Sequence, residues 1–112
     1  MTEIGIGIVG GGYMGKAHAV AMRAVAALFD TKLRPRLEMV AATRPETAET
    51  YRATYGFLRA TDDWRVLVND PAVEAVIIAT PQDSHRDIAE AAISLGKPVL
   101  CEKPLADSLE DA

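Results

Sequence analysis

The chain has 112 residues, of which 49% are hydrophobic and 25% charged, and its formal net charge is −4. This composition is typical of one folded domain. The acidic balance argues against binding to the nucleic-acid backbone, and no apolar run reaches the ~20 residues of a membrane span. The N-terminus carries Glu3 and lacks the basic start of a signal peptide, while the single cysteine, Cys101, excludes an internal disulfide and favours a reducing cytoplasm.

The pattern alternates between strand and helix from the first residues onward. Ile4, Ile6 and Ile8 alternate with glycine, which predicts a first strand with one nearly bare side. From residue 14 to residue 29 the apolar residues recur with a helical period. We expect this helix to bury a face made of Met14, Ala17, Ala21, Met22, Val25, Leu28 and Phe29, with His18 on the same side.

A charged connection over residues 30–36 is expected to lead into a second strand over residues 37–43. Arg44-Pro45-Glu46 then predicts the start of a helix, because proline fits the first helical position and an acid suits the positive end. Gly56 is placed to end this helix. A short third strand over residues 57–60 and a short helix starting at Asp62-Asp63 are expected to follow.

The uninterrupted apolar run Ala75–Ala79 predicts a strand buried on both faces. Ser84 and Asp87 have the spacing of a capping box, so a helix is expected to start at Ser84 and to end at Gly96. Val99–Cys101 is the expected fifth strand. A further capping-box pattern lies within the last six residues, from which we expect the sequence to be a piece of a longer protein.

These elements predict an α/β fold with a doubly wound parallel sheet, forming one domain over residues 1–112. The expected strand order is 3-2-1-4-5. Because parallel strands end at the same edge of a sheet, three connections should converge there. They are residues 10–15, 80–85 and 102–104.

Gly10, Gly12 and Gly15 spell G-x-G-x-x-G between the first strand and the first helix. In this context the glycines permit a tight turn, let the backbone approach a diphosphate, and let helix and strand pack closely. Tyr13 and Met14 fill variable positions of the motif, where their backbone amides matter more than their side chains. The motif predicts a dinucleotide site, the alternative being a plain strand-to-helix turn.

The end of the second strand bears on the choice of cofactor. An acidic residue there would bind the ribose 2′-hydroxyl of NAD, but this sequence has Thr43-Arg44. A hydroxyl and a guanidinium suit the 2′-phosphate of NADP, so the pair favours NADP slightly over NAD. Glu46 lies close enough to complicate this interpretation, and the alternative is that Arg44 is only a solvated loop charge.

Two further segments are Ala79-Thr-Pro-Gln-Asp-Ser-His85 and Leu95-Gly-Lys-Pro-Val-Leu-Cys-Glu-Lys-Pro-Leu-Ala106. With the glycine motif they resemble the N-terminal domain of the glucose–fructose oxidoreductase, inositol dehydrogenase and rhizopine-catabolism family (Gfo/Idh/MocA). The resemblance covers essentially the whole chain, although Gln82 stands where the family more often has Asn. It implies a Rossmann-like NAD(P)-binding domain, truncated before the substrate domain of the family.

The resemblance also implies residue roles. Glu102-Lys103-Pro104 would be the E-K-P motif of the family, in which Lys103 is catalytic and contacts the substrate hydroxyl and the nicotinamide region. Glu102 would position the cofactor or Lys103, and Pro104 is expected to be cis. The general base of the family is a histidine of the second domain. The cofactor cleft would be lined by Thr80, Pro81 and His85, with capping as the alternative role for His85.

We therefore expect an NAD(P)-dependent oxidoreductase that moves a hydride between the nicotinamide and a sugar, cyclitol or related polyol. The rival hypothesis is a non-catalytic module that binds or senses the nucleotide. The protein is expected to be cytoplasmic and, at full length, a homo-oligomer, with a small-molecule substrate and without nucleic-acid or membrane partners. Two histidines and one cysteine do not suggest a metal site. Trp64 and the tyrosines are expected to pack against the core.

Overall fold

The structure, a computed structural model, describes residues 2–10, 13–28, 33–80 and 82–101, in which strands and helices alternate as predicted. In chain order the elements are β1 (Thr2–Val9), α1 (Tyr13–Leu28), β2 (Leu33–Ala41), α2 (Pro45–Tyr55), β3 (Arg59–Thr61), α3 (Trp64–Asn69), β4 (Ala75–Ile78), α4 (Gln82–Ser94) and β5 (Val99–Cys101).

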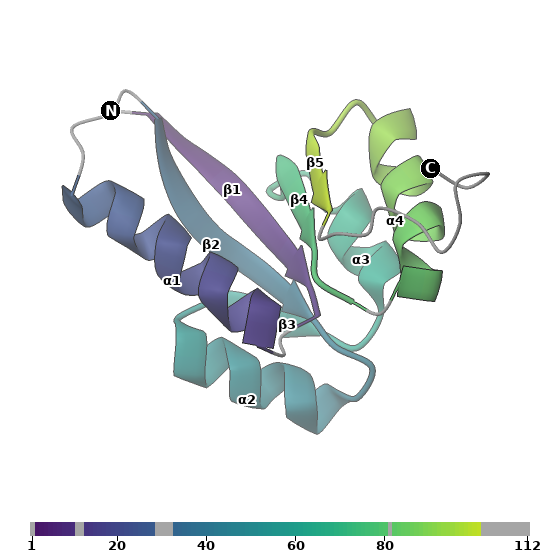
Figure 1. Cartoon of the computed structure of the whole chain (residues 1–112), viewed down its shortest axis with the longest axis horizontal. Coiled ribbons are helices and arrows are strands. Elements are labelled where there is room, and N and C mark those ends of the chain that lie inside the picture. The colour runs from purple at the N-terminus through teal and green to yellow at the C-terminus, as the bar shows by residue number, and fades with distance from the viewer. Residues whose placement is uncertain (1, 11–12, 29–32, 81, 102–112) are drawn as a thin grey trace.

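The five strands form one parallel sheet in the order β3-β2-β1-β4-β5. Helices α1 and α2 lie on one face of this sheet, and α3 and α4 lie on the other (Figure 1). The doubly wound fold class and the strand order are therefore confirmed. The direction of winding reverses between β1 and β4, which are neighbours, and ligands bind at such a reversal in open α/β sheets.

The glycines of β1 let α3 and the connection that follows it pack closely against the sheet. A Cβ atom added at Gly7 would lie 2.7 Å from both Leu67 Cδ2 and Val73 Cγ1, so the bare side of the strand is filled by these neighbours. On the opposite side, Ile6 and Ile8 are buried against the α1 and α2 layer. The alternation of isoleucine and glycine thus separates two apolar cores, one on each face of the sheet.

β2 begins at Leu33, whereas the sequence predicted Leu37 and a charged connection before it. The early part of β2 pairs with β1, where Pro35 lies opposite Ile4. β3 pairs with β2 only over Met39–Ala41, so Pro35 lies in a stretch with one neighbouring strand, where a missing N–H is tolerated.

Part of the predicted buried face of α1 differs from the structure, while Phe29 and the side chains of Met14, Val25 and Leu28 lie outside the description. Gly15 and Ala19 are buried and Met22 is half-buried, whereas Ala17 and Ala21, predicted to face inward, are exposed. The reason is that Gly15 must face the turn after β1, as described below, and this contact fixes the rotation of the helix about its axis.

Other element boundaries are shifted as well. α4 begins at Gln82, so Ser84 lies inside the helix and the predicted capping box was wrong. β3 occupies Arg59–Thr61 instead of 57–60, because Phe57 is buried in the core immediately after the end of α2. These shifts leave the predicted order of elements unchanged.

The predicted helix ends are confirmed at three places. Gly56 follows α2 with φ of 86°, and its N–H donates to Arg52 O at 3.0 Å. Asp63 caps α3 by accepting the N–H of Arg65 at 2.9 Å. Gly96 follows α4 with φ of 76°, a conformation that glycine adopts without steric cost.

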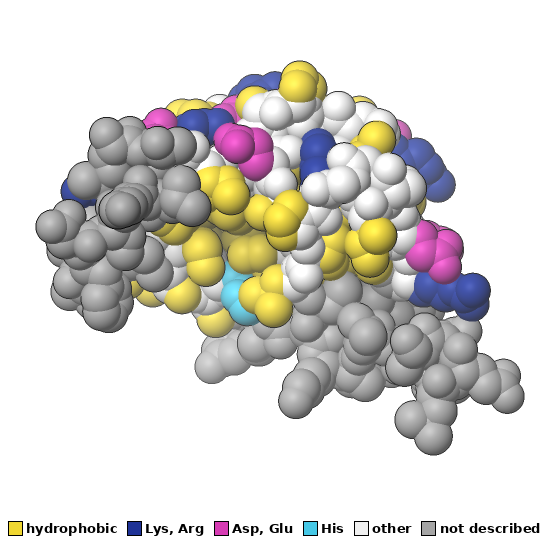
Figure 2. Space-filling model, turned by 90° about the horizontal axis from the view of Figure 1, so that it is seen from above, with side chains coloured by type: hydrophobic (Ala, Val, Ile, Leu, Met, Phe, Trp, Pro, Cys, Tyr) yellow, Lys and Arg dark blue, Asp and Glu magenta, His cyan; other side chains and the backbone are white. Residues whose placement is uncertain are grey.

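Trp64, Tyr51 and Tyr55 pack against the core as predicted. Tyr51 and Tyr55 stack with ring centroids 5.5 Å apart against the α1/α2-side core, and Trp64 packs against the opposite core. Apolar side chains also reach the surface, and Figure 2 shows several of them on the face that it presents. Within the described ranges, no helix combines the length and the apolar character needed to cross a bilayer.

Candidate functional site

Gly10 makes the turn that leaves β1 at the carboxyl edge of the sheet. Its φ is +93°, in the left-handed region, and its N–H donates to Ala41 O at 2.8 Å. A Cβ atom at this position would lie 2.7 Å from Ala79 O and 2.9 Å from Ala79 C. Both backbone conformation and space therefore require glycine here.

Gly15 is buried in the first turn of α1, against the turn made by Gly10. A Cβ atom at Gly15 would collide with Gly10 O, so the main chains of turn and helix touch directly. This contact brings the start of α1 to the end of β1. The first amides of a helix have no partner within it, and here no side chain of residue 10 or residue 15 can cover them. This cradle suits a diphosphate group.

The end of β4 completes one wall of this cradle. Ala79 N–H donates to Val9 O at 2.8 Å, which holds the end of β4 beside the end of β1. Thr80 is half-buried, and its Cγ2 lies 3.1 Å from the position of a Cβ at Gly10. The predicted convergence of the first and fourth strand ends is therefore observed.

Ala79 is a site residue that the sequence reasoning missed as such. Its methyl group lies 3.9 Å from the position of a Cβ at Gly15, in addition to its backbone contact with Gly10. A larger side chain at Ala79 would enter the space that the glycines leave open. The feature of the sequence that could have indicated this role is a small residue directly after a run of large aliphatic ones.

Thr43 and Arg44 are exposed in the connection from β2 to α2. Arg44 Nε lies 3.2 Å from Glu46 Oε1, and the two side chains are 73% and 67% exposed. Arg44 occupies the position before α2, where its exposed guanidinium is shared between solvent and Glu46. We call these two residues the Arg44–Glu46 pair.

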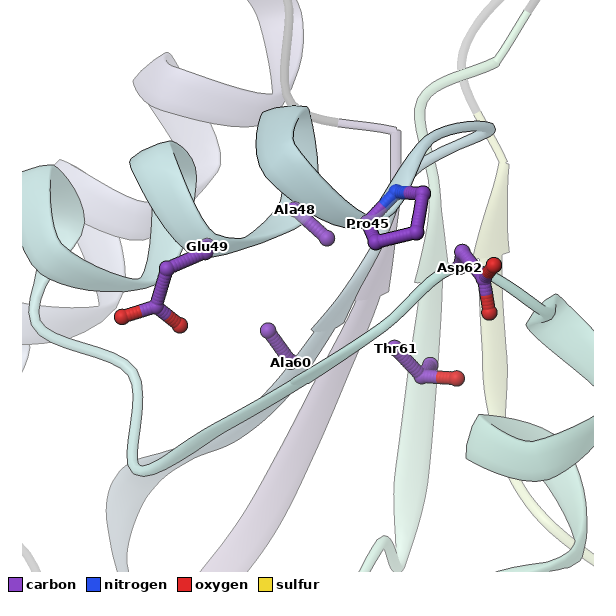
Figure 3. Close-up of a pocket in the computed structure, with 6 residues that line it drawn as sticks. All are labelled: Pro45, Ala48, Glu49, Ala60, Thr61 and Asp62. Carbon is purple, nitrogen blue, oxygen red and sulfur yellow. The ribbon is translucent and has the colours of Figure 1, made fainter.

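A pocket of about 260 Å³ adjoins this connection (Figure 3). Glu49 and Asp62 give it two carboxylates, and the guanidinium of Arg52 lowers the pKa of Glu49 through hydrogen bonds of 2.6 and 2.8 Å. Such a lining repels phosphate, so the glycine turn is the better phosphate site. The residues that line the pocket are Pro45, Ala48, Glu49, Ala60, Thr61 and Asp62.

Several predicted site residues are not placed in full. Tyr13 and Met14 are the first two residues of α1, and His85 lies near the start of α4, but their side chains are outside the description. Among the described residues, no three His, Cys, Asp or Glu side chains gather as a metal site would require. The predicted residues that lie outside the described ranges are Gly12, Pro81, Glu102, Lys103 and Pro104.

Comparison with known proteins gives concordant matches. The profile of a family described as oxidoreductase family, NAD-binding Rossmann fold, matches residues 4–112. Levoglucosan dehydrogenase of Pseudarthrobacter phenanthrenivorans is 40% identical over 113 residues, which cover 100% of this chain and 29% of that protein. Inositol 2-dehydrogenase 1 of Mycolicibacterium vanbaalenii is 36% identical over 110 residues, covering 98% of this chain and 30% of that protein.

The fold agrees with a solved structure of levoglucosan dehydrogenase in complex with NADH. The TM-score is 0.96 at 40% sequence identity, over 98% of this chain and 30% of that one. The chain therefore spans about 30% of the length of the relatives it matches.

Proposed function

Because this chain belongs to the oxidoreductase family with an NAD-binding Rossmann fold (Gfo/Idh/MocA), we propose that it is the cofactor-binding part of an NAD(P)-dependent dehydrogenase or reductase. The relatives are named for levoglucosan and inositol, which are small polyhydroxylated compounds. We propose a sugar, cyclitol or related polyol as the substrate class. The substrate would be bound largely by a second domain, in the part of the relatives' length that this chain does not span.

The observation that carries this proposal is the contact between Gly10 and Gly15 beside Ala79. The main chain of Gly10 contacts that of Gly15 at the start of α1 and that of Ala79 after β4, in space that a side chain on either glycine would fill. The backbone amides of Gly12, Tyr13 and Met14 would bind the diphosphate. Thr43 and Arg44 would contact the adenosine ribose, and the cleft would be lined by Thr80, Pro81 and His85.

The chemical step would use Lys103, which we propose holds the reacting substrate hydroxyl and stabilises negative charge that develops on its oxygen. Glu102 and Pro104 would position Lys103 and the cofactor. A bound nicotinamide supplies the exchange of a hydride with the substrate carbon. The proton of the hydroxyl requires a base, which we place in the second domain.

We further propose that the chain binds both nicotinamide cofactors, with a slight preference for NADP. A hydrogen bond from Arg44 to the 2′-phosphate would contribute about 1.5–3 kcal/mol, roughly tenfold or more in affinity. The carboxylate of Glu46, 3.2 Å from Arg44, offsets part of this gain.

The test is a fluorescence titration of the chain with NADH and NADPH, in the wild type and in Gly15→Ala. The added methyl collides with Gly10 O, so we expect both affinities to fall by more than about tenfold, while far-ultraviolet circular dichroism keeps its helical signal.

Gly96→Ala is the matched control. Its φ is +76° and no atom beyond its chain neighbours lies within 4 Å of the added methyl, so it incurs only the left-handed backbone cost of about 1–2 kcal/mol in stability. We expect its affinity for both cofactors to be unchanged. A folded Gly15→Ala variant that binds like the wild type would refute the proposed site.

A further inference from the structure

We propose that Glu46 is a specificity-determining residue, which limits the binding of NADP by holding the guanidinium of Arg44. This inference rests on the proposed function, because it concerns the cofactor that the site accepts. Its basis is the position of the Arg44–Glu46 pair, where β2 ends and α2 begins. Residues at this point of the fold lie beside the ribose of a bound dinucleotide.

The backbone around the pair is well defined. Arg44 is extended, with φ of −131° and ψ of 142°, and Pro45 follows as the first residue of α2. Proline fixes its own φ and restricts the residue before it, so Arg44 has little backbone freedom. Glu46 lies in the first turn of α2, with its carboxylate 3.2 Å from Arg44 Nε. The pair is therefore a local feature that does not depend on a distant element.

A 2′-phosphate carries a charge of about −1.5 to −2 near neutral pH and would need the same guanidinium. It must displace or share Arg44 with the carboxylate of Glu46, which also repels it. Both effects oppose NADP. NAD has a hydroxyl in place of the phosphate, so neither effect acts on it. Glu46 consequently changes the ratio of the two affinities and not the affinity for the shared diphosphate.

Glu46→Gln removes the charge and keeps the length of the side chain. Exposed ion pairs are weak, so we expect the affinity for NADPH to rise by about three- to tenfold, with that for NADH within about twofold of the wild type. In an Arg44→Gln background the same change should have a smaller effect, since there is no guanidinium to release.

Glu49→Gln is the matched control. Glu49 lies on the same helix, is 59% exposed against 67% for Glu46, and pairs with its own arginine, Arg52, at 2.6 Å. The substitution makes the same change in net charge and breaks a comparable ion pair. If the charge of α2 alone set the preference, both variants would shift it equally. We expect Glu49→Gln to leave the NADPH to NADH ratio unchanged.

The experiment measures the dissociation constants of NADH and NADPH for the wild type, the three single variants and Arg44→Gln/Glu46→Gln, at low and high salt. The inference is supported if the affinity for NADPH rises in Glu46→Gln and stays unchanged in Glu49→Gln. The gain from removing the charge of Glu46 should also be smaller at high salt and in the Arg44→Gln background. An unchanged ratio in Glu46→Gln, an equal shift in Glu49→Gln, or an undiminished gain in the Arg44→Gln background overturns it. A folded wild type that binds neither nucleotide would instead overturn the proposed function itself.

Discussion

The most informative test of the fold concerns Glu38, a nearly buried carboxylate on β2. It accepts hydrogen bonds from Arg36 Nε at 2.8 Å and from Arg59 Nε at 2.9 Å. Arg59 also makes two bonds to Asp70, at 2.8 and 2.9 Å. Glu38 thus connects β2 with β3 and, through Arg59, with the connection that leads into β4.

Glu38→Gln keeps the shape of the side chain but removes its charge and places an amide donor against arginine donors. A hydrogen bond to a charged group contributes about 1.5–3 kcal/mol, so two such bonds set an upper range of roughly 3–6 kcal/mol. The side chain of Glu38 is only 9% exposed, but those of Arg36 and Arg59 are 26% and 43% exposed, so water replaces part of the loss. We expect a net loss of about 2 kcal/mol in the free energy of unfolding.

Urea unfolding followed by circular dichroism should show the loss with an unchanged m value, and thermal unfolding should show a fall in Tm of about 10 °C. Glu49→Gln is the control, because the pair of Glu49 with Arg52 is exposed to solvent and should contribute little to stability. Equal losses in the two variants would refute the reasoning, since burial would then make no difference to the strength of the network.

Two further predictions concern the same region. Arg59 holds the pKa of Asp70 below its ordinary value of 3.8, so the stability that Asp70 contributes is complete above that pH and is lost as the pH falls through the lower folded-state pKa. The unfolding free energy of Asp70→Asn should therefore depend less on pH below about pH 4 than that of the wild type, and equally steep curves would contradict this. Lys97 Nζ donates to Val68 O at 2.5 Å and to Asp70 O at 2.8 Å, so Lys97→Met should cost about 1–3 kcal/mol in urea unfolding without changing NADH affinity. A variant as stable as the wild type would show that solvent satisfies these carbonyl groups.

The parts of the fold that follow from local chemistry could be predicted from the sequence. Glycines with left-handed φ at 56 and 96, the proline at the start of α2 and the alternation in β1 each act over a few residues. The glycine turn belongs to the same class, since its spacing between strand and helix is visible in the sequence. The order of the strands followed from the parallel winding that these elements impose.

The parts of the fold that depend on contacts between residues far apart in the sequence could not be predicted from it. The rotation of α1 is set by Gly15 against Gly10 O, which apolar periodicity cannot report when most candidates for the buried face are small. The role of Ala79 depends on β4 lying beside β1. The early start of β2 could not be predicted without knowing that Leu33 and Arg34 pair with β1, because the composition of this stretch is typical of a charged connection.

The unequal lengths of β2 and β3 have a consequence for behaviour at high concentration. β3 accompanies β2 only over Met39–Ala41, and among the described residues no strand lies beside the outer side of Leu33–Glu38. An open strand edge invites pairing with another molecule, the first step toward aggregation. Here that stretch contains Pro35, which lacks an N–H, and charged groups on Arg34, Arg36 and Glu38. Arg34, Pro35 and Arg36, which made this stretch resemble a loop in the sequence, therefore also discourage intermolecular strand addition.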